Sequence, residues 1–250
     1  MKDIDFTFGI ITDASTAARS RLIDIIISIQ NLNIPNFEII IVGNANNLSD
    51  FANHKIIDFN ENIKSKWITK KKNIITQNAT YDNIVYSHDY ILYDKDWYLG
   101  WKEFGENYDA CMNRIINVDG SRFRDWTIFD DHEFKDAALY SGYNKKTREN
   151  LLPYDEAALN RYQYFSGTYW VAKKSIMQEI PQDENLVWGQ GEDLVWANSF
   201  KRKYKFSMNA KSTVKIHPSQ THHHVIFSEM TPNTLTKVKE YMAIIDRQKL

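Results

Sequence analysis

The sequence predicts an α/β fold in which a mostly parallel central sheet is flanked by helices. Over residues 1–90, short apolar segments alternate with longer segments in which apolar residues recur at helical spacing. This alternation is typical of right-handed crossovers between parallel strands. The chain of 250 residues is long enough to bury a large core, and no repeat, low-complexity segment or linker divides it. We therefore expect a single domain over residues 1–250.

Apolar segments that end at polar residues predict the strands of the first half. Most are apolar on both faces, as strands buried between two layers of helices are. The predicted strands are 6–11, 37–42, 55–59 and 84–86. The intervening helices are expected at 15–32, with Ser15 or Thr16 as the N-cap, and at 67–78.

The second half of the sequence is less regular. Residues 109–118 are compatible with a strand or with a helix, and residues 120–146 predict a loop rich in charged and aromatic side chains. The remaining predicted elements are a strand at 164–171 interrupted by Gly167, helices at 173–180 and 192–200, a strand at 213–216 and a closing amphipathic helix at 234–245.

The composition argues against several classes of protein. The 31 basic and 32 acidic residues nearly balance, so no long-range field attracts nucleic acid or an anionic membrane. The single cysteine, Cys111, cannot form an intramolecular disulfide, and we interpret it as a buried thiol in a reducing compartment. The first residues lack the layout of a signal peptide, and the longest apolar segments, 23–29 and 37–42, are too short for a membrane helix of roughly 20 residues. We expect a cytoplasmic protein.

Polar residues follow every predicted strand of the first half. The carboxyl ends of parallel strands meet at one edge of the sheet, and ligands of such folds bind at this edge. The sequence therefore predicts a binding site there, formed by Thr12-Asp13, Gly43-Asn44, Asp58 and Ser87-His88-Asp89.

Asp89 is the first candidate for chemistry, because an apolar strand ends abruptly at its carboxylate. Hard cations such as Mg²⁺ prefer oxygen ligands and take one or two carboxylates together with the phosphates of a substrate. Asp89 is therefore a candidate metal ligand. The alternative is that Asp89 only starts a turn.

The segment Trp188-Gly189-Gln190-Gly191-Glu192-Asp193 is the second candidate. Its two glycines allow a tight approach of the backbone, and its acids begin a predicted helix. A helix start can fix a general base within hydrogen-bond reach of a hydroxyl, although the helix macrodipole by itself also favours acids there. Trp188 offers a flat apolar face for a sugar ring, in keeping with an aromatic content of 14%.

His217 is a third candidate, because it follows an apolar strand. It is either a metal ligand or a structural residue, and the nearby His222-His223-His224 cannot all face one ion. The sequence contains no His-Glu-x-x-His set, which argues against a zinc hydrolase.

Lys70, Lys71 and Lys72 precede Asp89 on a predicted helix. Because they are spaced around a turn, we expect most of them to be solvated. Lys72 is the one expected to reach a diphosphate.

Together these segments resemble GT-A glycosyltransferases. Residues 71–90 are similar, without a gap, to the passage of that family that leads from a basic-basic-Asn start through a helix and an apolar strand to the Asp-x-Asp metal motif. A strand region of the family is similar to residues 28–42, and its Ser-Gly strand beside the acceptor is similar to Tyr164–Gly167. The Trp-Gly-x-Gly-Glu-Asp motif of inverting, galactosyltransferase-like members is similar to residues 188–193. The resemblance extends from about residue 5 to about residue 220.

Two segments depart from the pattern of the family. Ser87-His88-Asp89 keeps one carboxylate where the family usually has two, which puts the metal dependence in question. Gly43-Asn44 stands where an acid usually ends the second strand.

The resemblance implies a GT-A fold with a nucleotide-sugar-binding half over residues 1–100 and an acceptor-binding half over residues 101–250. It implies transfer of a sugar from a UDP-sugar to a hydroxyl of a glycan or lipid-linked glycan, with inversion, in the cytoplasm or at the inner face of the membrane. The implied roles are Asp193 as general base with Glu192 beside it; Thr12, Asp13, Asn44, Asp58, Lys72, Asn73 and His88 around the nucleotide sugar; Asp89 and His217 on Mn²⁺ or Mg²⁺; and Trp188, Gly167, Trp170 and Trp126 toward the acceptor.

Two other classes of protein remain open. A non-catalytic sugar- or nucleotide-binding module could descend from such an enzyme, in keeping with the reduced metal motif. A sugar-phosphate nucleotidyltransferase normally needs a Gly-rich basic loop after the first strand, where this sequence has Asp13-Ala14-Ser15-Thr16 with Arg19 and Arg21 nearby.

Overall fold

The computed structural model describes residues 2–128, 147–156, 163–220 and 226–248. It contains an eight-stranded sheet in the order β3-β2-β1-β4-β10-β6-β11-β5. Four strands of the first half lie parallel to one another: β1 (Phe6–Ile11), β2 (Phe37–Gly43), β3 (Lys55–Asp58) and β4 (Asn83–His88). The carboxyl ends of β1, β2, β3 and β4 therefore meet at one edge, as the sequence predicted.

The second half of the sheet is mixed in direction. Strand β10 (Tyr169–Lys173) runs antiparallel to β4 and to β6 (Ala110–Ile116). Strand β11 (Phe206–Ile216) is parallel to β6, and β5 (Ile91–Tyr93) pairs antiparallel with β11 at the far edge. Residues 109–118, which the sequence left undecided, thus form a strand.

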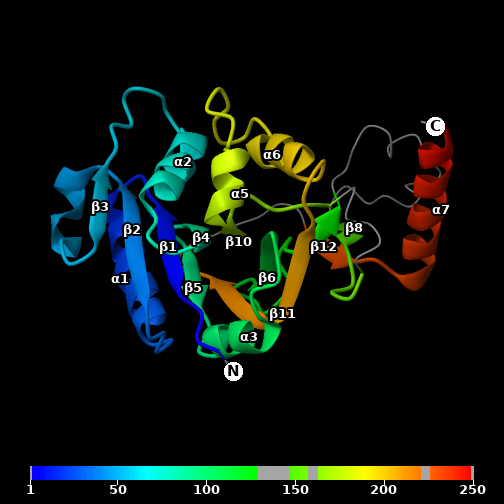
Figure 1. Ribbon diagram of the computed structural model, residues 1–250, viewed down its shortest axis with the longest axis horizontal. Helices are drawn as coiled ribbons and strands as arrows, with labels where there is room; N and C mark the ends of the chain where they lie inside the picture. The colour runs from blue at the N-terminus through cyan, green and yellow to red at the C-terminus, as the bar shows by residue number, and fades with distance from the viewer. Residues whose placement is uncertain (1, 129–146, 157–162, 221–225, 249–250) are drawn as a thin grey trace.

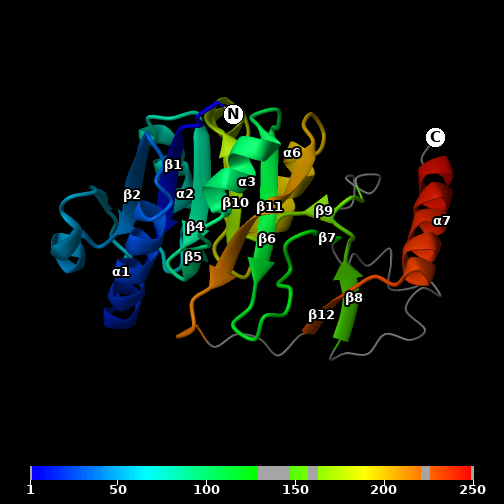
Figure 2. The same cartoon turned by 90° about the horizontal axis from the view of Figure 1, so that it is seen from below.

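Helices cover both faces of this sheet (Figures 1 and 2). On one face lie α1 (Thr16–Gln30) and α3 (Trp97–Phe104). On the other lie α2 (Ile68–Asn78), α5 (Lys174–Glu179) and α6 (Glu192–Phe200). A 3-10 helix, η1 (Ala45–Phe51), connects β2 to β3. The fold is α/β with a mostly parallel sheet flanked by helices, which confirms the predicted class.

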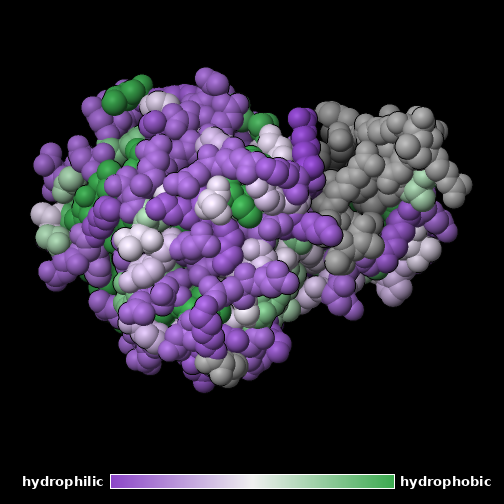
Figure 3. All heavy atoms as spheres, in the orientation of Figure 1, coloured by the Kyte–Doolittle hydropathy of each residue, from purple (hydrophilic) through white to green (hydrophobic). Residues whose placement is uncertain are grey.

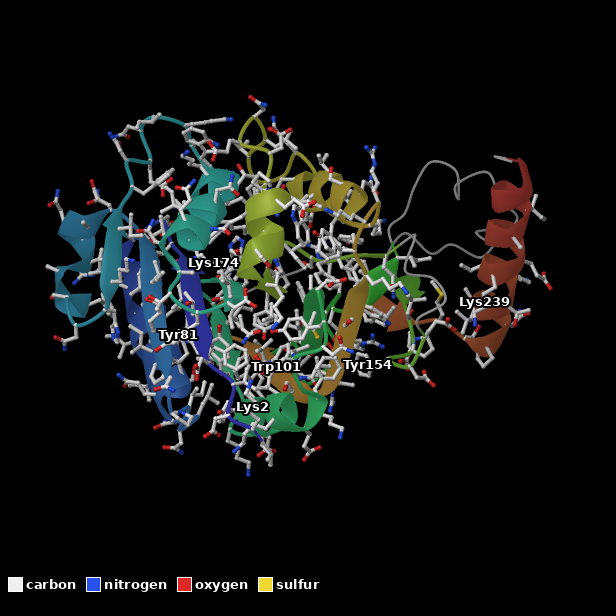
Figure 4. The ribbon with its side chains drawn as sticks, viewed as in Figure 1. Lys2, Tyr81, Trp101, Tyr154, Lys174 and Lys239 are labelled. Atoms are coloured by element: carbon white, nitrogen blue, oxygen red, sulfur yellow. The ribbon has the colours of Figure 1, made fainter. Side chains whose placement is uncertain are left out.

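A smaller sheet of four strands in the order β12-β8-β7-β9 lies beside the main one. Its strands are β7 (Thr127–Ile128), β8 (Thr147–Leu151), β9 (Gln163–Tyr164) and β12 (Ile226–Glu229). The closing helix α7 (Pro232–Gln248) stands at this end of the molecule, far from β3 (Figure 1). Lys239 on α7 pairs with Glu156 at 2.5 Å (Figure 4).

Aromatic side chains fill the two layers between sheet and helices. On the α3 face, Phe6 packs edge-on against Trp97 and Trp101, with ring centroids 4.9 and 5.6 Å away. On the α2 face, Trp170 stacks between Tyr86 and Trp196, at 5.2 and 5.4 Å. Figure 4 shows Trp101 at the base of the sheet, next to the N-terminal segment that carries Lys2.

Several elements follow the sequence prediction closely. Helix α1 begins after Ser15, whose Oγ accepts a hydrogen bond from the Ala18 N–H at 3.3 Å, so Ser15 is the cap. Helix α6 has the predicted bounds.

Other elements differ from the prediction. The expected strand at 164–171 is two strands in different sheets, because residues 165–168 leave β9 and enter β10. Helix α3 was not predicted, since its aromatic residues and Gly100 obscure helical spacing.

The hydropathy of the helices and of the surface was also compared. Within residues 2–128, 147–156, 163–220 and 226–248, no helix is long and apolar enough to cross a membrane. The face shown in Figure 3 is mostly hydrophilic, with separate small apolar patches.

Gly9 in β1 faces helix α2, and a Cβ there would lie 2.3 Å from Cγ2 of Ile75. We expect Gly9→Ala to lower the free energy of unfolding by about 1–3 kcal/mol, because the added methyl group would push α2 off the sheet. Urea denaturation measures this loss. In an Ile75→Ala background the same change should cost much less, since the clashing atoms are gone. Equal losses in both backgrounds would contradict the contact.

Candidate functional site

Asp89 follows β4 directly and is buried at the carboxyl edge of the sheet. The Thr12 hydroxyl, at the end of β1, donates to Oδ2 of Asp89 at 2.6 Å. Arg21 on α1 donates through Nη2 to Oδ1 of Asp89 at 3.1 Å and through Nε to its backbone oxygen at 2.8 Å. Both carboxylate oxygens are therefore engaged within the protein, and the charge of Asp89 is neutralised by a guanidinium.

Helix α2 contributes two buried lysines to the same edge. Lys71 donates to the backbone oxygen of Thr12 at 2.7 Å and pairs with Glu61. Lys72 is only 1% exposed; its Nζ donates to the Gly167 carbonyl at 2.9 Å and lies 4.2 Å from the Trp170 ring centroid. The expectation that most of these lysines are solvated was wrong, because two of them bind backbone carbonyls inside the protein. Lys72 faces Gly167 here, whereas the sequence placed it at a diphosphate.

The acidic pair lies at the start of α6. Gly191 has a φ of 71°, a left-handed conformation that favours glycine, and it turns the chain into the helix. The Asp193 carboxylate accepts from the Gly167 N–H at 3.0 Å and from the Leu194 N–H at 3.0 Å. Glu192 is buried beside it, and its Oε1 lies 3.2 Å from where a Cβ on Gly167 would be. The sequence prediction that these acids begin a helix is confirmed.

Residues 167 and 168 join the two groups into one network. The backbone oxygen of Thr168 accepts from the His88 N–H at 3.1 Å, and the Thr168 hydroxyl lies 3.4 Å from the Tyr90 hydroxyl. The end of β4 is thus joined to residues 167 and 168 through the His88 N–H, and Gly167 in turn binds Lys72 and Asp193.

The electrostatics of this network are set by burial and by opposing charges. Burial raises the pKa of Asp89, while the Thr12 hydroxyl and the Arg21 guanidinium oppose the rise. Burial, followed by the charge of Asp193, raises the pKa of Glu192, and the Lys72 ammonium opposes this. The site therefore holds its anions next to fixed cations.

Three other residues that the sequence placed around the nucleotide sugar lie along the same edge. The side chain of each accepts a hydrogen bond from a backbone N–H. The side chain of Asp13 accepts from Ser15 at 2.9 Å, that of Asn44 accepts from Asn46 at 3.1 Å, and that of Asp58 accepts from Ala45 at 2.9 Å. Asp13 and Asn44 shape the turns that follow β1 and β2, and Asp58, at the end of β3, is bound to the turn after β2.

Asn73 has a different environment from the one expected. Its amide nitrogen donates to the Gln182 carbonyl and to Glu184, both at 2.9 Å, and its oxygen accepts from the Gln182 N–H at 2.9 Å. Asn73 thus holds the segment before Trp188 in place, and we correct its expected contact with the nucleotide.

The aromatic residues expected at the acceptor divide into two groups. Trp126 is 2% exposed and Trp170 is 1% exposed, so both are core residues and neither offers a face to a ligand. Trp188 is 55% exposed, and the Lys66 ammonium lies 4.8 Å from its ring centroid. The other part of the expected acceptor region, residues 129–146, lies outside the described residues, as does the histidine triplet at 222–224.

The expected metal ligands are not assembled into a divalent-cation site. Nε2 of His217 lies 3.0 Å from Asp24 on α1, and its Nδ1 lies 2.8 Å from the Ser219 hydroxyl, so both ring nitrogens are engaged away from Asp89. Ser87, in place of the first acid of the motif, is buried and its hydroxyl lies 3.5 Å from the Gly9 carbonyl. In the part of the chain that the structure describes, no group of three or more His, Cys, Asp or Glu side chains could hold a metal ion by itself. These residues do not fit a resident Mn²⁺ or Mg²⁺.

Arg21 is the main residue of the site that the sequence did not reveal. An arginine in the middle of an amphipathic helix is ordinarily solvated, and only the position of Asp89 in space shows its role. Lys71 was missed for the same reason.

Comparisons with known proteins support the fold. No protein family matches the sequence, and no curated protein matches it either. Among solved structures, S. aureus TarS 1–349 in complex with UDP-GlcNAc is similar at 12% identity and a TM-score of 0.56, over 88% of this chain and 60% of that chain. The UDP complex of TarS 1–349 is similar at 11% identity and a TM-score of 0.49, over 96% and 65%.

This chain thus spans less than two thirds of the length of either TarS chain. The likeness to the UDP-GlcNAc complex confirms the expected GT-A-type fold.

The burial of Lys72 predicts a specific dependence of stability on pH. Burial lowers the pKa of Lys72 from 10.5 to about 8, against the opposing charges of Glu192 and Asp193. Between these two pH values the unfolded chain binds more protons than the folded one, so the stability contributed by Lys72 rises with pH, by at most about 1.4 kcal/mol per pH unit.

Urea denaturation of the wild type and of Lys72→Met, at a series of pH values from about 7.5 to about 9.5, measures this effect. The unfolding free energy of the wild type minus that of Lys72→Met should increase as the pH rises. A difference that stays constant would show that Lys72 does not titrate in this range.

Proposed function

We propose that this chain is a glycosyltransferase that moves a sugar from a nucleotide-sugar donor, a UDP-sugar in the first instance, to an acceptor hydroxyl. The observation that carries the proposal is the network that joins the strand end at Asp89 to the acids of α6 through Gly167 and Thr168. This network would hold a donor site and a general base close to each other on a GT-A-type sheet. The likeness to a TarS structure that contains UDP-GlcNAc supports the choice of donor.

The donor would lie across the carboxyl ends of β1, β2 and β4. Asp13 follows β1, Asn44 follows β2, and Asp58 ends the neighbouring strand β3. All three would contact the nucleoside. Residues 1–100 would then supply the donor side of the site, and residues 101–250 the acceptor side.

Asp193 would act as general base. Its Oδ1 and Oδ2 each accept one backbone N–H, which fixes the carboxylate but leaves lone pairs for an acceptor hydroxyl. The acceptor oxygen would attack the anomeric carbon opposite the nucleotide while its proton passes to Asp193. The bond to the phosphate oxygen breaks, the nucleoside diphosphate leaves with the electron pair, and the configuration inverts. Glu192, beside Asp193, would hold the donor or acceptor sugar.

The acceptor would be a glycan or a lipid-linked glycan. Trp188 supports this, because its exposed ring lies on the segment that leads into Glu192 and Asp193, with Lys66 over it. Aromatic faces of this kind pack against sugar rings.

A non-catalytic binding module is the second candidate. The engagement of both Asp89 oxygens and the replacement of one acid by Ser87 favour it. Against it stands the fixed carboxylate of Asp193, which a module that only binds would not need.

Asp193→Asn should lower kcat/KM by about 10²–10⁴-fold, because the amide cannot take the proton of the acceptor. Transfer from UDP-GlcNAc and other UDP-sugars to a panel of glycan acceptors measures activity, and calorimetry measures the affinity for UDP, which should be unchanged. Asp50→Asn, an exposed carboxylate on η1 paired with Arg19, is the matched control. Near-normal turnover by Asp193→Asn would show that Asp193 is not the general base. Binding of UDP-sugars without turnover by the wild type would favour the non-catalytic binding module.

Trp188→Ala should raise the KM for the acceptor by about three- to tenfold, because the sugar ring loses its platform. The Kd for UDP should not change. Trp188→Phe keeps an aromatic face and should retain most of the affinity. An equal rise for both variants, or an effect on UDP alone, would assign Trp188 to another role.

A further inference from the structure

A cavity of about 320 Å³ lies between α2 and α5, which are neighbours on one face of the sheet (Figure 1). Its walls come from three segments: α2, α5 and the stretch 181–184 that follows α5. Neither Asp89 nor Asp193 lines it. The cavity is therefore separate from the proposed site of transfer.

Gln182, in the wall of this cavity, is a buried residue whose side chain is not satisfied by the fold. It is 2% exposed, and its backbone is fixed by Asn73, which accepts from its N–H and donates to its carbonyl, both at 2.9 Å. The side-chain oxygen and nitrogen of Gln182 are both buried and have no hydrogen-bond partner among the residues that the structure describes. An unpaired buried amide lowers the stability of a protein, so packing alone does not account for a glutamine here.

Two more glutamines stand at the same cavity. Gln77 on α2 and Gln178 on α5 are exposed, and their side-chain amides form no hydrogen bond within the described part of the chain. Each glutamine amide offers two N–H donors and one carbonyl acceptor. Three segments of the chain thus bring uncommitted amides to one cavity.

The rest of the lining is neutral or apolar. Glu184 is the only ionisable residue of the lining, and its carboxylate pairs with Lys70 at 2.9 Å and accepts from Asn73 at 2.9 Å. Met177 and Pro181 supply apolar surface. The cavity therefore offers no free charge for a phosphate or for a charged peptide.

These properties fit a sugar ring. Neighbouring hydroxyls of a sugar both donate and accept, as amides do, while its C–H face packs against apolar side chains. The volume lies at the lower end of the range for small-ligand pockets, roughly 300–1,000 Å³, so there is room for one small unit.

The cavity is connected to the proposed acceptor platform by a short segment. Glu184 lies four residues before Trp188, and its carbonyl accepts from Nε1 of Trp67 at 2.7 Å. Thr69 on α2 donates to the Leu186 carbonyl at 2.8 Å. Residues 184–188 are thus held along the N-terminal part of α2, between the cavity and Trp188.

We propose that this cavity binds one neutral sugar unit of a glycan, apart from the site of transfer. The inference rests on the proposed function in taking this glycan to be the acceptor. A glycan held at a second place keeps its end at a high effective concentration near the acids of α6.

Saturation-transfer difference NMR of the wild-type chain with maltotriose, with cellotriose and with triacetylchitotriose tests the proposal, and a titration with each trisaccharide that binds gives the Kd. Gln182→Met removes the amide and keeps an unbranched side chain. It should weaken binding by about tenfold or more, because the sugar hydroxyls lose their partners. Gln178→Ala, at an exposed position, should weaken binding by about two- to fivefold. Gln30→Met, at the exposed end of α1, is the matched control and should bind as the wild type does.

Thermal melting of Gln182→Met provides a second readout. The variant should melt at or above the wild-type temperature, because an apolar side chain replaces an amide that has no partner in the fold. A melting temperature well below that of the wild type would show that the amide is satisfied within the protein, and would overturn the inference.

The binding outcomes separate this inference from the proposed function. Binding that persists in Trp188→Ala and is lost in Gln182→Met supports the cavity. Binding that is lost in Trp188→Ala and kept in Gln182→Met, or no binding of any of the trisaccharides, overturns the cavity and leaves the transferase proposal standing. Binding in the cavity without turnover of any UDP-sugar keeps the sugar site and removes the transferase.

Discussion

Two buried ammonium groups on one helix hold the site together. Lys71 binds the carbonyl of Thr12 at the end of β1, and Lys72 binds the carbonyl of Gly167 before β10. Burying a lysine costs free energy unless its ammonium is paired and hydrogen-bonded, so these contacts define where α2 must lie. Because Gly167 also binds Asp193, the distance from the strand ends to the acidic pair depends on α2. The parallel and antiparallel parts of the sheet, which meet at β4 and β10, are joined at this point.

Helix α1 fixes the other side of the same edge. Arg21, Asp24 and Ser28 lie on one face of the helix, since they are three and four residues apart. Each contacts a different segment: Arg21 binds Asp89, Asp24 contacts His217, and the Ser28 hydroxyl accepts from the Tyr93 N–H at 3.2 Å. This row holds the end of β4, the end of β5 and the end of β11 against α1. His217 thereby acts in the packing of α1.

The first half of the fold was predictable from the sequence, and the reasons are local. Continuous apolar segments such as 37–42 can be predicted to be buried strands without knowledge of the strands they pair with. Ser15 caps α1 through a contact with Ala18, three residues away in the sequence. The site was predictable where a residue is fixed by its own element, as Asp89 is by β4 and Asp193 by α6. It was not predictable where the partner is remote: Lys72 contacts a carbonyl 95 residues away, and Arg21 contacts a residue 68 positions away. The roles of the aromatic residues were not predictable for another reason: Trp170 in the core and Trp188 at the surface are the same residue type, and their exposure is set by remote packing partners.

The strand order has a consequence for how the protein is made. Strands β4 and β5 are close in sequence, yet β10, β6 and β11 lie between them in the sheet. The edge of β4 that faces away from β1 therefore stays unpaired until residues 169–173 are made, and β5 stays unpaired until residues 214–216 are made. At synthesis rates of roughly 5–20 residues per second, the nascent chain carries these open edges for several seconds. Such non-local pairing slows folding and leaves strand edges free to associate with other chains. Expression at low temperature or with added chaperone should accordingly raise the soluble yield of this chain more than that of an α/β protein whose strands pair in sequence order.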